Sequence, residues 1–462
     1  NLVPKKNEEI RGTLLGVLDD CVTSVGSREL KKIIKNPFLN IEKIKQRQFY
    51  VDYFYNDVLL RESIREYLKD IYDVERIAGK IIYGTENGKD LLSLKDSIRK
   101  SLETYRLLKE HQEIKDILDI DVKILLDIYN KIELIINIEA PFSVREGGII
   151  KDGYNSELDE LRKISKLGKD FILEIEQRER ERTGIKGLKI KYNKVFGYFI
   201  EVTKANEHLV PEDYIRKQTL VNSERYIVPD LKEYEEKVIT AKSKIEALEY
   251  ELFKQLTSEI KEHIDSLYKL ANKIANLDIV SNFAHIATKN SYVKPEISEE
   301  DILEIKGGRH PIVETLIASG TYVKNDIILD DKNNLIILTG PNMSGKSTYM
   351  KQVALNIIMA HIGSYVAADY AKIPIVDKIF TRVGASDDLL TGQSTFMLEM
   401  TEVASILNSA TNKSFIVLDE IGRGTSTYDG ISIATAITEY IHNIIGAKTI
   451  FATHYIIEKT IV

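Results

Sequence analysis

The chain has 462 residues, of which 43% are hydrophobic and 29% charged, and its formal net charge at pH 7 is -7. Because one hydrophobic core rarely grows beyond about 250 to 300 residues, this length predicts several domains, and the acidic balance excludes a uniformly basic nucleic-acid binder while allowing a local basic surface. The single cysteine, Cys21, excludes a disulfide framework within the chain, and the lack of a long uncharged apolar run or a signal-peptide pattern predicts a cytosolic or nuclear protein.

Residues 1 to about 125 are predicted to form an all-helical core domain. Apolar residues recur there at helical spacing, as at Ile71, Val74 and Ile77, and short breaks such as residues 36–37 and 84–88 interrupt the pattern. The segment contains no catalytic constellation, so its Arg and Lys residues are interpreted as a solvated surface.

Longer helical patterns follow at residues 126–182 and again at residues 231–290. Apolar residues stand three or four apart from Leu158 onward, and the stripe that begins at Ile245 continues for roughly eight turns. We expect two long helical arms, one leading out and one returning, that pair in antiparallel fashion. The residues between them are then carried at the tip.

This insert, residues 183–230, changes period from helix to strand. Leu188, Ile190 and Tyr192 alternate with lysines, and residues 198–203 alternate in the same way. Between residues 186 and 225, eight basic residues stand against five acidic ones, so the insert is positively charged. It is predicted either to contact phosphate oxygens without reading bases or to be an ordinary solvated β tip. The candidate contacts are Lys191, Asn193, Lys194, Asn206, Lys217 and Asn222.

From residue 291 to residue 462, strands alternate with helices, which predicts an α/β domain with a parallel sheet. Four apolar residues, 335–338, run into a G-x-x-x-x-G-K-S loop that an apolar-periodic helix follows. This pattern predicts a phosphate-binding loop whose backbone N–H groups surround the phosphates, with Lys346 reaching the β and γ phosphates and Ser347 holding Mg²⁺. The candidate loop residues are Gly340, Pro341, Asn342, Met343, Ser344, Gly345, Lys346, Ser347 and Thr348.

Two further strands end in polar side chains that fit the same chemistry. The apolar residues 415–418 precede Asp419 and Glu420, which is typical of a Walker B segment: Asp419 would complete the Mg²⁺ shell and Glu420 would align or deprotonate an attacking water. His454 follows residues 449–453, where its side chain could sense the γ phosphate; a lone histidine at a strand end is usually structural, but its spacing after the other two elements favours the functional role. Upstream, Tyr322 is a candidate for stacking on a base, although most tyrosines are simply core residues.

Four motifs in this order resemble those of the MutS family of DNA mismatch-repair ATPases, in the bacterial mismatch-repair branch. They are TGPNMSGKST at 339–348, GQSTFMLEM at 392–400, LDEIGRGTSTYDG at 418–430 and FATHY at 451–455. Outside them, YFIEVTKAN at 198–206 and RYI at 225–227 resemble the family's clamp, and GTLL at 12–15 resembles the start of its core domain. The resemblance covers essentially the whole chain.

The resemblance implies a multidomain fold: an all-α core, long lever helices, a small β clamp and a C-terminal P-loop ATPase domain of ABC type. It implies a homodimer with two composite ATP sites, in which Ser394 approaches the nucleotide of the other subunit and Tyr322 stacks on adenine. Lys346, Glu420 and His454 would then serve hydrolysis of ATP to ADP and phosphate with Mg²⁺. The implied partners are double-stranded DNA and a MutL-type repair factor, at the bacterial nucleoid.

The sequence also departs from the family's pattern. The family reads mismatches with a Phe-x-Glu wedge in an N-terminal domain followed by a connector, and no such segment precedes Gly12. Lys324 stands where many relatives carry Pro, and the chain ends before the usual C-terminal dimerisation helices. We therefore expect a fragment that binds and hydrolyses ATP and holds DNA weakly, without discriminating a mismatch.

A second hypothesis is an ATP-switched, DNA-junction-binding scaffold like the family members that lack a mismatch reader. A third, an SMC-like coiled-coil ATPase, would place its long coil between the Walker A and Walker B segments. Here both segments follow the helical arms, so this order excludes the third reading.

Overall fold

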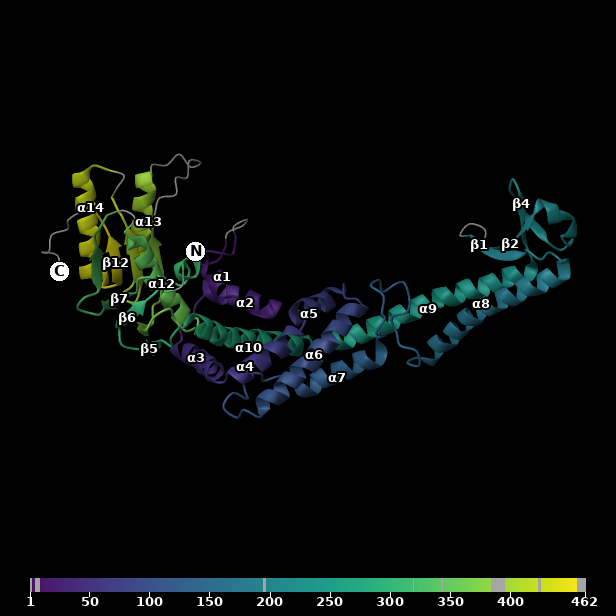
Figure 1. The fold of residues 1–462 in the computed structure, drawn as a ribbon, viewed down its shortest axis with the longest axis horizontal. Coiled ribbons are helices and arrows are strands. Elements are labelled where there is room, and N and C mark those ends of the chain that lie inside the picture. Colours follow the sequence, from purple (N-terminus) through teal and green to yellow (C-terminus); the bar gives the residue numbers. More distant parts are fainter. Residues whose placement is uncertain are drawn as a thin grey trace. The chain divides into compact units, whose positions relative to one another are not determined.

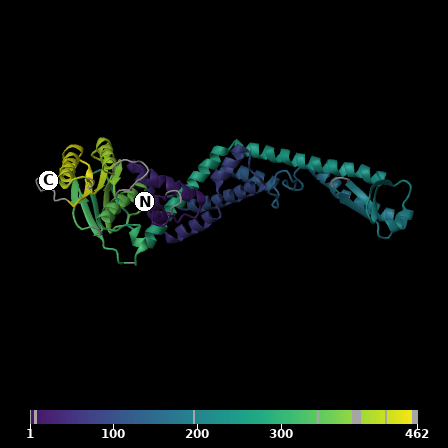
Figure 2. The same cartoon turned by 90° about the horizontal axis from the view of Figure 1, so that it is seen from above.

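The computed structural model describes residues 2–4, 9–193, 197–318, 320–341, 344–383, 395–422 and 425–454, with the elements seen from two directions in Figures 1 and 2. The chain divides into two compact units. The first comprises Asn1–Asp73, Lys100–Ile120 and Lys269–Val462, and the second comprises Val74–Arg99 and Asp121–Tyr268. The protein is therefore multidomain and rich in helices, as the sequence predicts. No described helix combines the length and the apolar character needed to cross a membrane.

In the first unit, the buried Asp278 anchors the N-terminal helices to a long helix. Asp278 lies on α10 (Ile264–Asn290), and its carboxylate accepts hydrogen bonds from the Val22 N–H (3.1 Å), the Thr23 N–H (2.8 Å) and the Thr23 hydroxyl (2.6 Å). Thr23 in turn caps α2 by accepting from the Gly26 N–H. Burial raises the pKa of Asp278, so these donors are what make a buried carboxylate tolerable there. The helices before α10 in this unit are α1 (Leu14–Leu18), α2 (Ser24–Lys35), α3 (Ile41–Asn56) and α4 (Val58–Lys69), with α6 (Gly88–Lys109) contributing its last turns.

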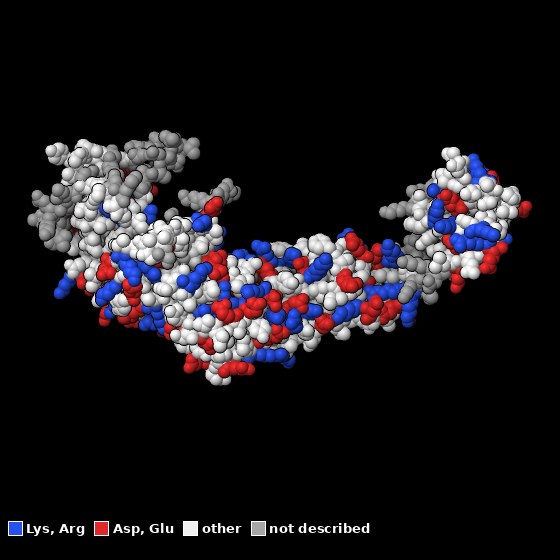
Figure 3. Space-filling model, in the orientation of Figure 1, with Lys and Arg blue, Asp and Glu red and all other residues white. Residues whose placement is uncertain are grey.

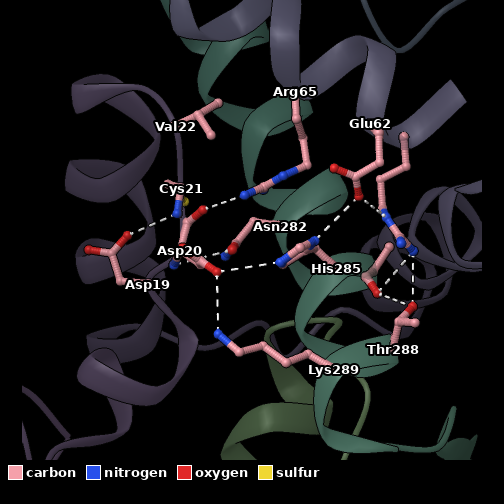
Figure 4. Close-up of polar contacts among 12 residues, drawn as sticks. Asp19, Asp20, Cys21, Val22, Glu62, Arg65, Asn282, His285, Thr288 and Lys289 are labelled. Carbon is pink, nitrogen blue, oxygen red and sulfur yellow. Dashed lines mark hydrogen bonds and ion pairs between the residues drawn. The ribbon is translucent and has the colours of Figure 1, made fainter. Parts of the chain in front are cut away.

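Further polar contacts extend this anchor along α10, as Figure 4 shows. The Asn282 amide donates to the Leu18 carbonyl at 2.7 Å, and Arg65 of α4 donates to the Asp20 carbonyl at 2.8 Å. The His285 ring lies between carboxylates of Asp20 and Glu62, at 3.5 and 3.4 Å. The loop between α1 and α2 is thus held by α10 and α4 together.

The C-terminal part of the first unit contains two four-stranded sheets. One is entirely parallel, in the order β10-β11-β12-β8, and the other has the order β5-β9-β6-β7. The parallel sheet consists of β8 (Leu335–Leu338), β10 (Ile379–Arg382), β11 (Phe415–Asp419) and β12 (Lys448–Ala452). The mixed sheet consists of β5 (Glu296–Ser298), β6 (Leu303–Gly308), β7 (Asn325–Leu329) and β9 (Tyr370–Pro374).

Helices cover the parallel sheet and complete its core. The helix α12 (Lys346–His361) contacts β11 and β12, and every residue from Met350 to His361 except Lys351 is buried. A cluster of buried residues joins α13 (Thr395–Ser409) and α14 (Thr427–Tyr440) to β11 and β12 through Val403, Ile437 and Phe451, among others. The remaining elements are α11 (Val313–Leu316) and the π-helix η2 (Ile441–Ile445).

The second unit pairs two long helices, α8 (Ser156–Thr183) and α9 (Pro229–Lys261). Glu249 of α9 is 1% exposed; its carboxylate accepts from the Ile149 N–H (2.7 Å) and pairs with Arg162 of α8 (2.7 Å). A buried acid with both a cation and an N–H donor fixes the register of the two helices. The other helices of this unit are α5 (Val74–Tyr83), α7 (Val122–Ile135) and the first turns of α6.

Between α8 and α9 the chain forms the strands that the alternating pattern predicts. They make an antiparallel sheet in the order β1-β2-β4-β3. Gly184, with φ of 71°, ends α8, and Ile175 of that helix packs with strand residues such as Ile200 and Tyr226 in one small core. The elements are β1 (Lys189–Asn193), β2 (Gly197–Thr203), the 3-10 helix η1 (Lys204–Leu209), β3 (Ile215–Thr219) and β4 (Ser223–Ile227).

The returning apolar stripe differs from the sequence expectation in one respect. The stripe from Ile245 to Ile274 predicts one continuous helix, whereas the structure divides it between α9 and α10. At the break, the Glu262 N–H still reaches the Ser258 carbonyl, but the His263 N–H bonds to the Ile260 carbonyl, three residues back. A tightened turn of this kind ends α9 but leaves the three- or four-residue spacing of the apolar residues unchanged, so the sequence pattern does not reveal it. The expected domain boundaries remain a prediction.

Candidate functional site

The register of the parallel sheet gathers the polar strand ends at one edge. Leu338 of β8 pairs with Ala452 of β12, and Ala452 pairs with Asp419 of β11. The Thr453 N–H then donates to the Leu338 carbonyl at 3.1 Å. Because parallel strands end on the same side of a sheet, the segments that follow all three strands meet there.

The loop between β8 and α12 forms one wall of this edge. Gly345 has φ of 96°, a conformation that glycine adopts without strain, and it caps the first turn of α12. Lys346 is 8% exposed, and its ammonium donates to the carbonyls of Gly340 (2.6 Å) and Pro341 (3.0 Å). A buried cation and a helix N-terminus therefore face the same small space, an arrangement that favours phosphate groups.

That space is a pocket of about 640 Å³. Its lining from the loop and α12 consists of Thr339, Ser344, Gly345, Lys346, Thr348 and Tyr349, and Tyr322 and Asn325 line it from the start of β7 and the segment that leads into it. The Tyr322 hydroxyl donates to the Gln352 amide oxygen of α12 at 2.8 Å, which fixes the ring at the wall. The structure thus brings Ser344, Gly345, Lys346 and Thr348 of the predicted loop to one pocket with Tyr322, the predicted base-stacking tyrosine.

Ser347 and Asp419 form a second feature of the edge. The Ser347 hydroxyl donates to Asp419 Oδ2 at 2.6 Å. Asp419 Oδ1 is buried and has no hydrogen-bond partner among the described residues, so this oxygen is available to a cation. Within the described part of the chain, no three His, Cys, Asp or Glu side chains are arranged as a metal site by themselves. One hydroxyl and one carboxylate fit Mg²⁺, which is usually held by one or two protein groups plus phosphates and waters.

Glu420 and His454 stand next to this pair. Glu420 has φ of 61°, a left-handed conformation that is strained for a non-glycine residue, and its N–H donates to the Ala452 carbonyl at 2.8 Å. His454 Nε2 lies 2.7 Å from Glu420 Oε1. Both predicted residues therefore meet at the end of the sheet.

A residue without a role in the sequence-based hypothesis also belongs to this neighbourhood. Glu399 of α13 is 7% exposed, and its Oε1 accepts from the Gly422 N–H at 2.7 Å. Glu399 falls inside the motif at residues 392–400. An acidic residue between apolar ones in a predicted helix indicates a buried polar contact, and the sequence-based hypothesis did not use this signal.

Some predicted site residues lie outside the described ones. They are Asn342 and Met343 of the loop, Ser394 of the motif before α13, and Lys194 of the β insert.

The described candidates on the β insert do not form one cluster. Lys191 and Asn193 lie on β1, whereas Lys217 lies on β3, and these strands are the two outer strands of the sheet. Lys191 pairs with Glu201 at 3.1 Å, and Figure 3 shows basic and acidic side chains side by side on the visible face of this sheet. Lys217 stands at a register shift of β3, where a bulge can redirect a side chain.

Asn206 and Asn222 come closer together. Asn206 lies on η1, directly after β2, and its amide donates to Thr203 at 3.3 Å. Asn222 lies in the turn before β4, and its carbonyl accepts from the Lys204 N–H at 3.2 Å. One end of the sheet therefore carries two amides and the exposed Lys204, a residue that sequence reasoning did not select.

Comparison with known protein families shows to which family the chain belongs. The family described as MutS domain III matches residues 1–284, which is more than half of the chain, and the family described as MutS domain V matches residues 336–460. The chain belongs to the MutS family.

Relatives of this MutS-family chain bear the name "DNA mismatch repair protein MutS". The chain is 96% identical over 455 residues to that of Fusobacterium nucleatum subsp. nucleatum, a match that covers 98% of this chain and 51% of the relative. It is 51% identical over 447 residues to that of Acetivibrio thermocellus, with 96% of this chain and 51% of the relative covered. For Caldanaerobacter subterraneus subsp. tengcongensis the identity is 50% over 462 residues, with coverage of 98% and 52%. The chain thus spans about half the length of these curated relatives.

A buried histidine beside the pocket predicts a pH dependence of stability in this MutS-family chain. His310 Nδ1 accepts from the N–H groups of Ile312 and Val313, and burial lowers the pKa of His310 to about 4. As the pH falls below about 6.5, the unfolded chain binds this proton before the folded chain does, so the free energy of unfolding falls. Between pH 7 and pH 4.5 the contribution of His310 is a loss of about 2 to 3 kcal/mol.

His310→Asn keeps an acceptor near the position of Nδ1 but does not titrate. The free energy of unfolding, measured with urea at pH 7 and at pH 4.5, should therefore fall less in this variant than in the wild type. His208→Gln, at an exposed histidine, serves as the control and should keep the wild-type loss. An equal loss in His310→Asn and the wild type would contradict the assignment.

Proposed function

We propose that the chain is a Mg²⁺-dependent ATPase that acts in DNA mismatch repair. The observation that carries the proposal is the meeting of Lys346, the Ser347–Asp419 pair and the Glu420–His454 pair at one edge of a parallel sheet. These are the groups that P-loop ATPases use for positioning and charge stabilisation of a transferred phosphoryl group. The relatives are named as DNA mismatch repair proteins, which supplies the repair context and favours it over the junction-binding scaffold.

Each residue has a distinct role in the proposed reaction. The ammonium of Lys346, now bonded to two loop carbonyls, would move to the β and γ phosphates. Ser347 and Asp419 would hold Mg²⁺, which neutralises phosphate charge when bound. Glu420 would accept a hydrogen bond from the attacking water, His454 would hold Glu420 and contact the γ phosphate, and Tyr322 would stack on adenine.

We further propose that two copies of the chain complete each site, with Ser394 of the second copy facing the nucleotide. Two large side chains beside the proposed interface, Met397 on α13 and Tyr428 on α14, are 61% and 85% exposed. Exposed side chains of this kind are typical of interface anchors. The Gly422 to Gly430 segment is the proposed lining of that interface.

The second unit is proposed to act as lever and DNA clamp. The α8–α9 pair, held in register by Glu249 and Arg162, would transmit movement, and the sheet between the two helices would contact the phosphates of double-stranded DNA. A MutL-type factor remains the proposed downstream partner, and the bacterial cytoplasm, with its nucleoid DNA, the proposed place of action. Lack of mismatch discrimination in this chain remains a prediction.

Two substitutions separate nucleotide binding from hydrolysis. Lys346→Ala removes the cation of the pocket, and we expect the Kd for ATP to rise about tenfold or more, since hydrogen bonds to charged groups contribute about 1.5 to 3 kcal/mol. Glu420→Ala removes the group that orients water, and we expect turnover to fall about 100-fold or more while the Kd stays within about threefold of the wild type. Titration with a fluorescent ATP analogue and phosphate release measure the two quantities.

Lys351→Ala, on the same helix and outside the pocket, is the matched control and should leave both quantities unchanged. Normal hydrolysis in Glu420→Ala would contradict the catalytic role, and an unchanged Kd in Lys346→Ala would contradict the phosphate-binding role.

The clamp proposal predicts a change in the salt dependence of DNA binding. If Lys217 contacts a phosphate, Lys217→Ala should reduce the slope of log K against log salt by about 0.9 for duplex DNA. Lys123→Ala, an exposed lysine on α7 of the same unit, should leave the slope at its wild-type value. Equal slopes for Lys217→Ala and the wild type, measured by fluorescence anisotropy over a salt series, would remove Lys217 from the interface.

A further inference from the structure

Glu399 is a buried carboxylate that contacts the turn directly after Glu420, the proposed hydrolytic residue. It lies in the second turn of α13, and its Oε1 accepts the Gly422 N–H at 2.7 Å in a buried environment. Gly422 is only two residues beyond Glu420, whereas Glu399 is 23 residues away from Gly422 in sequence. The contact therefore ties a helix to the turn that carries Glu420.

This turn has little freedom to adjust. Glu420 has φ of 61° and Gly422 has φ of 85°, and a Cβ on Gly422 would lie 3.0 Å from backbone atoms of Gly430 on α14. The side of the turn toward Asp419 is held by the ladder between β11 and β12 and by the bond from the Glu420 N–H to the Ala452 carbonyl. The other side is held at Gly422 by Glu399. A strained residue between two such attachments keeps one conformation as long as both persist.

The helix that carries Glu399 is itself fixed to the sheet. Glu402, three residues further on and on the same face of α13, pairs with Arg382 Nε at 2.8 Å. Arg382 ends β10, where it pairs in register with Leu418 of β11. Glu399 and Glu402 thus connect α13 to the turn after β11 and to the neighbouring strand β10.

We propose that Glu399 is a positioning residue for Glu420: by holding the Gly422 N–H, it fixes the turn and thereby the direction of the Glu420 carboxylate. The proposal rests on the proposed ATPase function and adds a determinant of turnover that does not touch nucleotide. Without this acceptor, the turn loses its hydrogen bond to α13, and the strained backbone at Glu420 can relax. Glu420 then points away from the attacking water, while the phosphate loop around Lys346 is unaffected.

The experiment compares Glu399→Ala with Glu399→Gln in the full chain. We expect kcat to fall about 10- to 100-fold in Glu399→Ala, since small misplacement of a reacting group costs factors of this size, and the Kd for ATP to stay within about threefold. Glu399→Gln retains an oxygen that accepts the same N–H, so its kcat should stay within about threefold of the wild type. Ser405→Ala, at an exposed position of the same helix, is the control and should keep both quantities.

Three outcomes would overturn the proposal: unchanged kcat in Glu399→Ala, equal impairment of the Gln and Ala variants, or a loss of ATP affinity that matches the loss of kcat. Circular dichroism checks that each variant folds. If Glu399→Ala does not fold, Glu399→Asp takes its place, because the shorter side chain withdraws the acceptor. A folded Asp variant with wild-type kcat would overturn the proposal as well.

The wild-type measurement separates this inference from the function on which it rests. A wild-type chain that neither binds nor hydrolyses ATP would remove both. A wild-type chain that hydrolyses ATP, together with an unimpaired Glu399→Ala variant, would leave the ATPase function standing and overturn only the positioning role of Glu399.

Discussion

The parallel register of β8, β12 and β11 is the constraint on which the rest of the site depends. Leu338, Ala452 and Asp419 stand side by side across these strands. The strands are short, β11 and β12 are mostly buried and β8 is half-buried, so backbone hydrogen bonds and apolar packing set their positions to within one residue. A shift of one residue would turn the side chain after each strand to the opposite face, and Ser347 and Asp419 would no longer meet.

The strain at the site depends on the same framework. Glu420 keeps its left-handed backbone because the β11–β12 ladder holds one side of the turn and Glu399 holds the other. A residue with backbone strain of about 1 to 3 kcal/mol keeps its conformation only where well-packed surroundings hold it. The buried residues of α12, α13 and α14 provide that core, and so the fold and the proposed chemistry are connected through a few backbone hydrogen bonds.

The local features of the site could be predicted from the sequence, because they are encoded in short runs of residues. The glycine-rich loop before Lys346 and the carboxylates Asp419 and Glu420 after an apolar strand are read from spacing alone. The contact between Glu399 and Gly422 could not be predicted, because it joins segments 23 residues apart through tertiary packing. The break between α9 and α10 could not be predicted from the sequence either, because one apolar stripe continues through both helices. In the insert, the strands were predictable from alternation, but their order, which separates Lys191 from Lys217, was not.

We propose that this edge of the sheet binds and hydrolyses MgATP and that duplex DNA influences the reaction. Steady-state phosphate release by the full chain, measured with and without Mg²⁺ and with and without duplex DNA, tests it most directly. We expect turnover that requires Mg²⁺ and whose rate changes when DNA is added. Absence of turnover together with absence of ATP binding in an equilibrium titration would contradict it.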